Sequence, residues 1–127
     1  MATPRENAQN HHRLDYIELT VDDIAAAKSF YSGAFAWRFT DWGDDYSGFE
    51  DGRMSGGIHN QGEVTPGGPL VILYSKDLEA SAAAVEAHGG RIVAPIFSFP
   101  GGRRFHFADP AGNVLGVWSD TPAREAS

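Results

Sequence analysis

The sequence contains no cysteine among its 127 residues. Disulfide bonds, thiolate zinc sites and a cysteine nucleophile are therefore excluded, and the absence is compatible with a reducing cytoplasm. Long hydrophobic runs are also absent, since no apolar stretch approaches the roughly 18 residues that a membrane helix needs. The polar start of the chain has no segment of signal-peptide type. We expect a cytoplasmic protein without a membrane partner.

Positive charge is scarce as well. Ten Lys and Arg residues stand against 17 Asp and Glu residues, which gives a formal net charge of −7. A nucleic-acid backbone requires a basic surface, so no nucleic-acid partner is expected, whereas a cationic small molecule would be favoured. The Gly-rich segments 66–69 and 99–102 are prolyl turns and not phosphate loops, and no nucleophile elbow is present. Hydrolase and nucleotide-binding functions are therefore not expected.

The most informative feature that is present is an internal repeat. Residues 16–27 align with residues 70–81 without a gap, and the offset from Asp23 to Asp77 is 54 positions. In each copy a strand-like segment is followed by that aspartate, which we expect to cap a helix. Two copies of one unit predict a pseudo-symmetric fold, and a site between the copies then has predictable positions.

Turn-forming residues divide the chain further. The pattern predicts a single α+β domain over residues 13–120, built from two βαβββ modules at 13–60 and 69–119. The other expected segments are a flexible leader at 1–12, a Gly- and Pro-rich linker at 60–69, a tail at 121–127, helices at 24–35 and 77–88, and strands at 14–21, 37–42, 46–50, 53–59, 70–74, 91–97, 103–107 and 114–118.

Two motifs make the chain resemble a known family. The first runs from Leu19-Thr20-Val21-Asp22-Asp23-Ile24 to Phe35-Ala36-Trp37, and the second is Phe107-Ala108-Asp109-Pro110-Ala111-Gly112-Asn113. Together they resemble the vicinal oxygen chelate superfamily, which includes glyoxalase I, bleomycin-resistance proteins and extradiol dioxygenases. Ala36 stands where that family commonly has glycine. The resemblance implies a glyoxalase-like fold in which a curved mixed sheet surrounds a cavity, and a homodimer.

The resemblance also implies where a metal would bind. Enzymes of the superfamily hold a divalent metal with His and Glu side chains on the first and last strands of each module. Those positions fall at Tyr16, Leu70, Gly56 and Gly116, and none of the four is a usual ligand. We therefore expect no cofactor and no metal ligands at these positions, and a divalent metal held by other residues is the alternative left open.

Two residues are candidates for catalysis. Glu18 lies on the face of its strand opposite Ile17 and is either a general base or the partner of a cationic ligand. The alternative is a carboxylate that is paired with Arg38, Arg103 or Arg104, or that is exposed at a sheet edge. His106 is either a proton shuttle, or with Glu18 the start of an unusual metal site, or a structural histidine. His59 is expected to have no catalytic role.

The expected function is the binding of a small organic molecule in the sheet-lined cavity without the usual metal. The alternative is a metal-dependent lyase, isomerase or dioxygenase of the glyoxalase type. Whether the chain is an enzyme is left open. The residues expected to contact a ligand, by alternation along their strands, are Tyr16, Glu18, Thr20, Leu70, Tyr74, Arg104 and Trp118.

Overall fold

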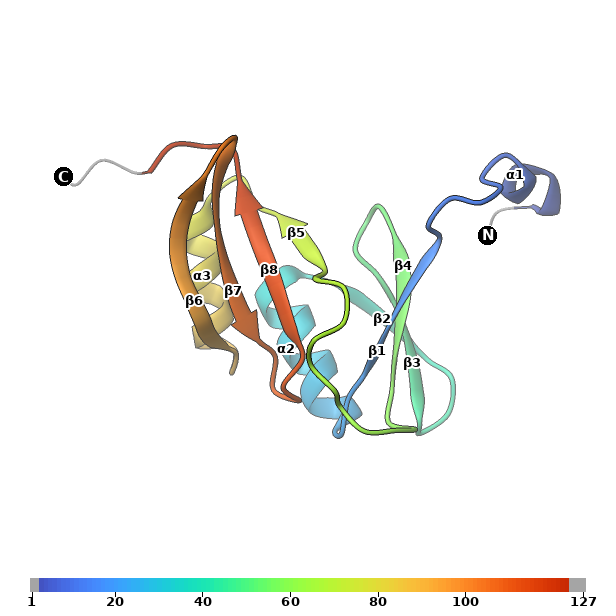
Figure 1. Ribbon diagram of the computed structural model, residues 1–127. Helices are drawn as coiled ribbons and strands as arrows, with labels where there is room; N and C mark the ends of the chain where they lie inside the picture. Colours follow the sequence, from blue (N-terminus) through green and yellow to red (C-terminus); the bar gives the residue numbers. More distant parts are fainter. Residues whose placement is uncertain (1–2, 124–127) are drawn as a thin grey trace.

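The computed structural model describes residues 3–123 and contains the two modules that the repeat predicts. Both modules follow the order βαβββ (Figure 1), so the α+β glyoxalase-like fold is confirmed. The first module comprises β1 (Tyr16–Thr20), α2 (Ile24–Phe35), β2 (Arg38–Asp41), β3 (Tyr46–Glu50) and β4 (Ser55–His59). The second comprises β5 (Ile72–Tyr74), α3 (Leu78–Ala87), β6 (Arg91–Phe99), β7 (Gly102–Ala108) and β8 (Val114–Ser119).

A further short helix, α1 (Pro4–Ala8), lies in the segment expected to be a flexible leader. Its cap is reciprocal, because the Glu6 amide donates to the Thr3 hydroxyl and the Glu6 carboxylate accepts from Thr3. None of its residues is buried. The helix therefore rests on local capping and not on packing.

The two long helices begin as the repeat predicts. Asp23 accepts a hydrogen bond from the Ala26 amide at 3.0 Å, and Asp77 accepts one from the Ala80 amide at 3.1 Å. Their C-terminal caps differ. Ala36, which caps α2, is in the left-handed conformation with φ 60°, whereas His88, which caps α3, has φ −107°. Ala36 is at the position where the superfamily commonly has glycine, and a left-handed alanine is strained relative to glycine.

The strands form two four-stranded sheets that are not hydrogen-bonded to each other within residues 3–123. The first sheet has the order β1-β4-β3-β2 and the second has β5-β8-β7-β6. β1 is parallel to β4, β5 is parallel to β8, and the remaining neighbours are antiparallel. In Figure 1 the second sheet is seen face-on with α3 behind it, and α2 lies between the sheets. The expected curved sheet is thus divided into two halves.

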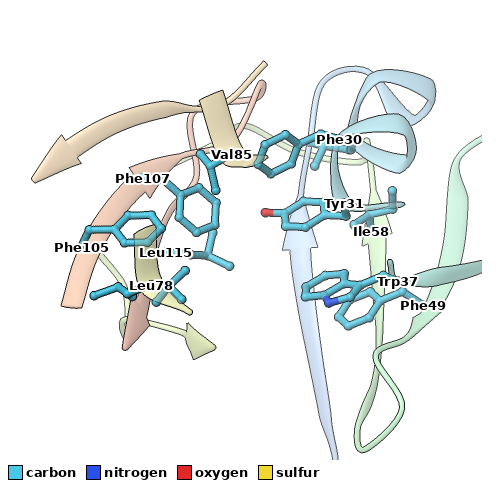
Figure 2. Close-up of a cluster of buried hydrophobic side chains, with 13 residues drawn as sticks. Phe30, Tyr31, Trp37, Phe49, Ile58, Leu78, Val85, Phe105, Phe107 and Leu115 are labelled. Carbon is cyan, nitrogen blue, oxygen red and sulfur yellow. The ribbon is translucent and has the colours of Figure 1, made fainter. Parts of the chain in front are cut away.

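The core joins the modules through aromatic side chains of α2. Tyr31 stacks on Trp37 with ring centroids 4.5 Å apart, and Phe30 contacts Phe107 of the second module at 5.8 Å. Figure 2 shows these rings between the first sheet and the side chains of the second module. Burial of such large rings is the main apolar contribution to holding the modules together.

A buried polar connection adds to this core. The Tyr31 hydroxyl donates to Asp109 Oδ2 at 2.8 Å, and Figure 2 shows that hydroxyl pointing toward the second module. The same turn supplies Asn113, whose side-chain amide donates to the Thr20 carbonyl at 2.8 Å. Burial and the neighbouring Asp109 raise the pKa of Tyr31 well above its ordinary value. The Asp-Pro-Ala-Gly-Asn turn therefore connects the modules as well as reversing the chain.

Candidate functional site

Each sheet packs its helix against one face, and the opposite face, called the outer face below, carries the candidate site residues. On β1, Ile17 and Leu19 point toward the core, so Tyr16, Glu18 and Thr20 point to the outer face. The parallel pairing of β1 with β4 places Glu18 beside Gly57 and Thr20 beside His59. Strand β3 adds Tyr46 beside His59.

Three side chains of the first outer face form a row of hydrogen bonds. The Tyr46 hydroxyl donates to Glu18 Oε2 at 3.0 Å, which uses its single proton. The Tyr16 hydroxyl therefore donates to the Tyr46 oxygen, at 2.5 Å. Burial, followed by the hydrogen bonds with Tyr16 and Glu18, raises the pKa of Tyr46 well above its ordinary value. Tyr46 is thus held as a protonated donor to the carboxylate, and Tyr16 donates to the Tyr46 oxygen.

His59 lies on the other side of Glu18 from Tyr46. The Gln61 amide donates to His59 Nδ1 at 3.1 Å, so the proton of the neutral ring is on Nε2. Nε2 lies 3.2 Å from the Thr20 hydroxyl oxygen and 3.6 Å from Glu18 Oε1. We call Tyr16, Tyr46, Glu18, His59 and Thr20 the first-face array. It offers hydroxyl groups, a carboxylate and an imidazole to a polar ligand.

Glycine makes room for the array. A Cβ at Gly57 would collide with the hydroxyl of Tyr46, and it would lie 2.8 Å from that of Tyr16. The residue before it, Gly56, faces the other way, because its Cβ would meet the Phe49 ring in the core. The expectation that Gly56 shares a face with Tyr16 is therefore wrong by one residue. The equivalent of Gly116 is Gly57, since Glu18 pairs with Gly57 as Ile72 pairs with Gly116.

The outer face of the second sheet carries aromatic rings around Arg104. The registers align Tyr74, Trp118, Arg104 and Phe97 in a row across all four strands. Tyr74 and Trp118 meet edge to face with centroids 5.2 Å apart. The Arg104 guanidinium carbon lies 5.2 Å from the Phe97 ring centroid and 5.4 Å from that of Phe99. We call these five residues the second-face row.

His106 lies on the next row of that face. It pairs with Gly116, whose Cβ, if present, would lie 3.2 Å from the imidazole. Burial, and then the positive charge of Arg104, lower the pKa of His106, so the neutral ring is favoured. Its Nε2 atom is buried without a hydrogen-bond partner among the described residues. Glu18 and His106 lie on different sheets, and in this chain Glu18 meets His59 instead.

A cavity of about 660 Å³ lies between the two modules. Its walls are the core-facing side chains of β1 and β5, such as Leu19 and Leu73, and the β3–β4 loop. Tyr74 and Trp118 also line it, whereas Tyr16, Glu18 and Thr20 point to the opposite side of β1. The sheet faces that the sequence assigned to a ligand therefore lie mostly outside this cavity.

The structure brings together some of the predicted residues and adds two. Tyr16, Glu18 and Thr20 meet in the first-face array, Tyr74, Arg104 and Trp118 in the second-face row, and Leu70 lies just before β5, 38% exposed. His59 and Tyr46 were not predicted. A prediction that β1 pairs in parallel with β4 would have indicated His59, because this pairing places His59 directly beside Thr20.

The described residues do not form a metal centre of their own. Residues 3–123 contain no cluster of three or more His, Asp or Glu side chains that could hold an ion. Of the family positions, Tyr16 donates to Tyr46, Leu70 has no donor atom, and the last-strand positions Gly57 and Gly116 have no side chain. Glu18 and His59 alone make a pair of donors, fewer than a stable divalent site requires.

Comparison with known proteins identifies the family of the fold. The family model described as the Glyoxalase/Bleomycin resistance protein/Dioxygenase superfamily matches residues 13–117. Among curated proteins, the anthracycline biosynthesis protein DnrV of Streptomyces peucetius is 29% identical over 124 residues, which covers 81% of this chain and 45% of DnrV. CFP32 of Mycobacterium tuberculosis is 27% identical over 136 residues, covering 91% of this chain and 48% of CFP32. The chain thus spans about half the length of these relatives.

Solved structures share the fold at low sequence identity. A glyoxalase-related enzyme from Fulvimarina pelagi superposes with a TM-score of 0.74 at 19% identity, covering 85% of this chain and 88% of that one. The fosfomycin resistance protein FosX from Mesorhizobium loti gives 0.72 at 18% identity, covering 87% and 93%. In residues 3–123, no helix has the length and apolar character needed to cross a membrane.

Proposed function

The chain belongs to the Glyoxalase/Bleomycin resistance protein/Dioxygenase superfamily, and from that membership we propose that it binds a small organic molecule between its outer sheet faces without a metal. The observation that carries the proposal is the first-face array. Tyr46 donates a hydrogen bond to Glu18, and His59 Nε2 lies 3.6 Å from the same carboxylate, beside the position where metal-dependent relatives are expected to hold an ion. Hydrogen-bonding side chains take the place of ligands there.

We further propose that two copies complete the binding site. Large side chains remain exposed on both outer faces: Tyr16 is 47%, Ile72 42% and Tyr74 54% exposed. Exposed apolar surface of this kind is typical of an interface. We place the first outer face of one copy opposite the second outer face of the other, an arrangement that a twofold axis repeats on both sides of the dimer. A ligand enclosed there contacts the first-face array on one wall and the second-face row on the other.

The aromatic side chains favour a planar or apolar ligand. Trp118 and Tyr74 present ring surface, and the tyrosine hydroxyls and Glu18 fix the orientation of a polar group. DnrV is named for anthracycline biosynthesis, and anthracyclines are polycyclic aromatic molecules. This name supports an aromatic ligand for the present chain.

The test is a thermal-shift screen of aromatic compounds followed by calorimetry of the hits. We expect Tyr16→Ala and Trp118→Ala each to weaken binding about tenfold, because each removes contact area or a donor. Binding equal to wild type in both variants would reject the site. Light scattering tests the dimer: a particle of 13.7 kDa at micromolar concentration would contradict it, and twice that mass is expected.

The second candidate function is a metal-dependent lyase, isomerase or dioxygenase. One observation favours it. Glu18 and His59 lie on neighbouring strands, and Glu18 Oε1 is 3.6 Å from His59 Nε2, so both atoms could contact one metal ion. Such an enzyme needs a third ligand, and the described part of the chain provides none beside them. Metal content therefore decides between the two functions.

A further inference from the structure

The second outer face holds an arginine without a hydrogen-bond partner. No hydrogen bond or ion pair joins Arg104 to another residue of 3–123, and its Nε atom is buried without an acceptor. Arg103 precedes it on the same strand and faces α3, where its two terminal nitrogens donate to the Glu79 carboxylate at 2.9 and 3.1 Å. The Nε of Arg103 is also buried without a partner, so the two arginines differ in their terminal nitrogens. Those of Arg103 are paired with Glu79, and those of Arg104 have no partner among the described residues.

The surroundings hold this guanidinium in place. The rings of Phe97 and Phe99 lie within cation–π distance of it, at 5.2 and 5.4 Å. Trp118 is its neighbour on β8 and adds a flat aromatic surface beside it. Ordering a long flexible side chain costs conformational entropy. Because the rings already order Arg104, less of that cost remains when an anion binds.

His106 adds a second unused polar group two residues along the same face. Its Nε2 is buried without a partner among the described residues, as the Nε of Arg104 is. A buried polar atom left without a hydrogen bond is costly. The Nε–H of Arg104 needs an acceptor, and His106 needs one too in the tautomer that carries its proton on Nε2. Asp120 follows the end of β8 and accepts a hydrogen bond from Tyr74 at 2.6 Å.

We propose that Arg104 and the rings around it form a subsite for the carboxylate of a planar aromatic acid, with the aromatic part of the ligand against Trp118. This inference rests on the proposed function, because it names the chemical class of the ligand in the same site. A guanidinium can bind a carboxylate with two parallel hydrogen bonds. The net charge of −7 does not oppose this, because charges more than roughly 8 Å away are screened at physiological ionic strength.

Titration calorimetry with 2-naphthoate and 2-naphthamide tests the proposal, because the two probes share one ring system and differ in charge. Wild type should bind the naphthoate more tightly. Arg104→Gln should weaken naphthoate binding by about tenfold or more, the size expected for a charge-assisted hydrogen bond. The same variant should leave naphthamide binding within about twofold. Arg104→Lys keeps the charge but loses the planar guanidinium. Its affinity for the naphthoate should therefore lie between those of wild type and Arg104→Gln.

Arg103→Gln is the matched control. It removes the same charge from the same strand on the opposite face, and it should leave the ratio of the two affinities unchanged. Near-ultraviolet circular dichroism should show that each variant retains the native packing of its aromatic side chains. If Arg104→Gln unfolds, the wild-type affinity ratio and the Arg104→Lys variant still decide.

Three results would overturn the inference. Equal affinity of wild type for both probes would show that no cation acts on the carboxylate, although the proposed function would stand. Dissociation of the dimer by Arg104→Gln would show that the arginine pairs with the second copy and not with a ligand. Binding of neither probe would reject the subsite, and the compound screen with Tyr16→Ala and Trp118→Ala would then judge the proposed function separately.

Discussion

The outer faces of the two sheets occupy equivalent places in the repeat and differ in chemistry. Glu18 on the first face corresponds to Ile72 on the second, and Thr20 corresponds to Tyr74. The first face is a hydrogen-bonded network of hydroxyl, carboxylate and imidazole groups, whereas the second is a row of rings around Arg104. The shared backbone therefore does not determine the chemistry of a face.

The core-facing positions show the opposite behaviour. Ile17 and Leu19 in β1 correspond to Val71 and Leu73 at β5, and all four are apolar side chains packed at or near the core. Burial constrains these positions to apolar side chains of suitable size, while the outer face tolerates many residue types. The two modules of this chain therefore differ most at every second residue of their strands.

The largest effect is expected from cutting the polar connection between the modules. Asp109 accepts hydrogen bonds from Tyr31, from the Asn113 side chain and from two amides of its own turn. Asp109→Ala should lower the free energy of unfolding by about 3 kcal/mol, because it leaves the buried Tyr31 hydroxyl without an acceptor. Urea denaturation followed by Trp fluorescence measures this. Asp109→Asn, which keeps the shape, should cost less, and equal losses would contradict the account.

Two adjacent glycines of β4 compare the core with the outer face, because Gly56 faces the core and Gly57 faces the outer face. Gly56→Ala places a methyl group against the Phe49 ring and the Ile17 carbonyl, so it should destabilise by about 2 kcal/mol. Gly57→Ala displaces only the ends of Tyr46 and Tyr16, which can rotate away, and should cost about 1 kcal/mol through lost hydrogen bonds. Thermal melts of both variants provide the comparison. A larger loss for Gly57→Ala would reverse the assignment of the two faces.

The pH dependence of stability should identify the first-face array. The pKa of Tyr46 is raised in the folded state, so above about pH 10 the unfolded chain binds fewer protons than the folded one. The contribution of Tyr46 is complete below that pH and is lost as the pH rises, by less than about 1.4 kcal/mol per pH unit. The free energies of unfolding of wild type and Tyr46→Phe, measured by urea denaturation from pH 8 to 11, should therefore converge as the pH rises. Parallel curves would exclude this role for Tyr46.

The smallest effect is expected from the ion pairs that join each helix to its sheet. Lys28 of α2 lies 2.8 Å from Asp41 of β2, and Arg103 of β7 lies 2.9 Å from Glu79 of α3. Arg103 forms the fork-shaped, less exposed pair, so Arg103→Gln should lower the melting temperature slightly more than Lys28→Gln. Added salt should reduce both differences. The reverse order would show that geometry and burial do not rank these pairs.

The sequence was sufficient for most of the fold. Alternation located the strands, and the aspartates Asp23 and Asp77 predicted both helix starts, because these signals depend on nearby residues. Helix α1 was missed although Thr3 and Glu6 form a capping pair, because it lacks an apolar face. The division into two sheets could not be read locally, since it depends on how the edge strands β1 and β5 lie in space.

The candidate site was predicted only in part for a similar reason. Glu18 and Tyr16 were found because alternation along one strand assigns a face. His59 was missed because its role comes from a partner on a parallel strand, and parallel strands are joined by long connections. The register slipped at Gly56 and Gly57 because two glycines carry no side-chain pattern that distinguishes the faces.

The central claim is that the first-face array occupies the place of a metal. Elemental analysis by mass spectrometry, on protein purified without a histidine tag and then dialysed after exposure to Ni, Fe, Mn and Zn, tests it most directly. The account predicts a metal content far below one ion per chain, unchanged in Glu18→Gln and in a variant of its neighbour, His59→Gln. About one ion per chain in wild type, lost in both variants, would contradict it.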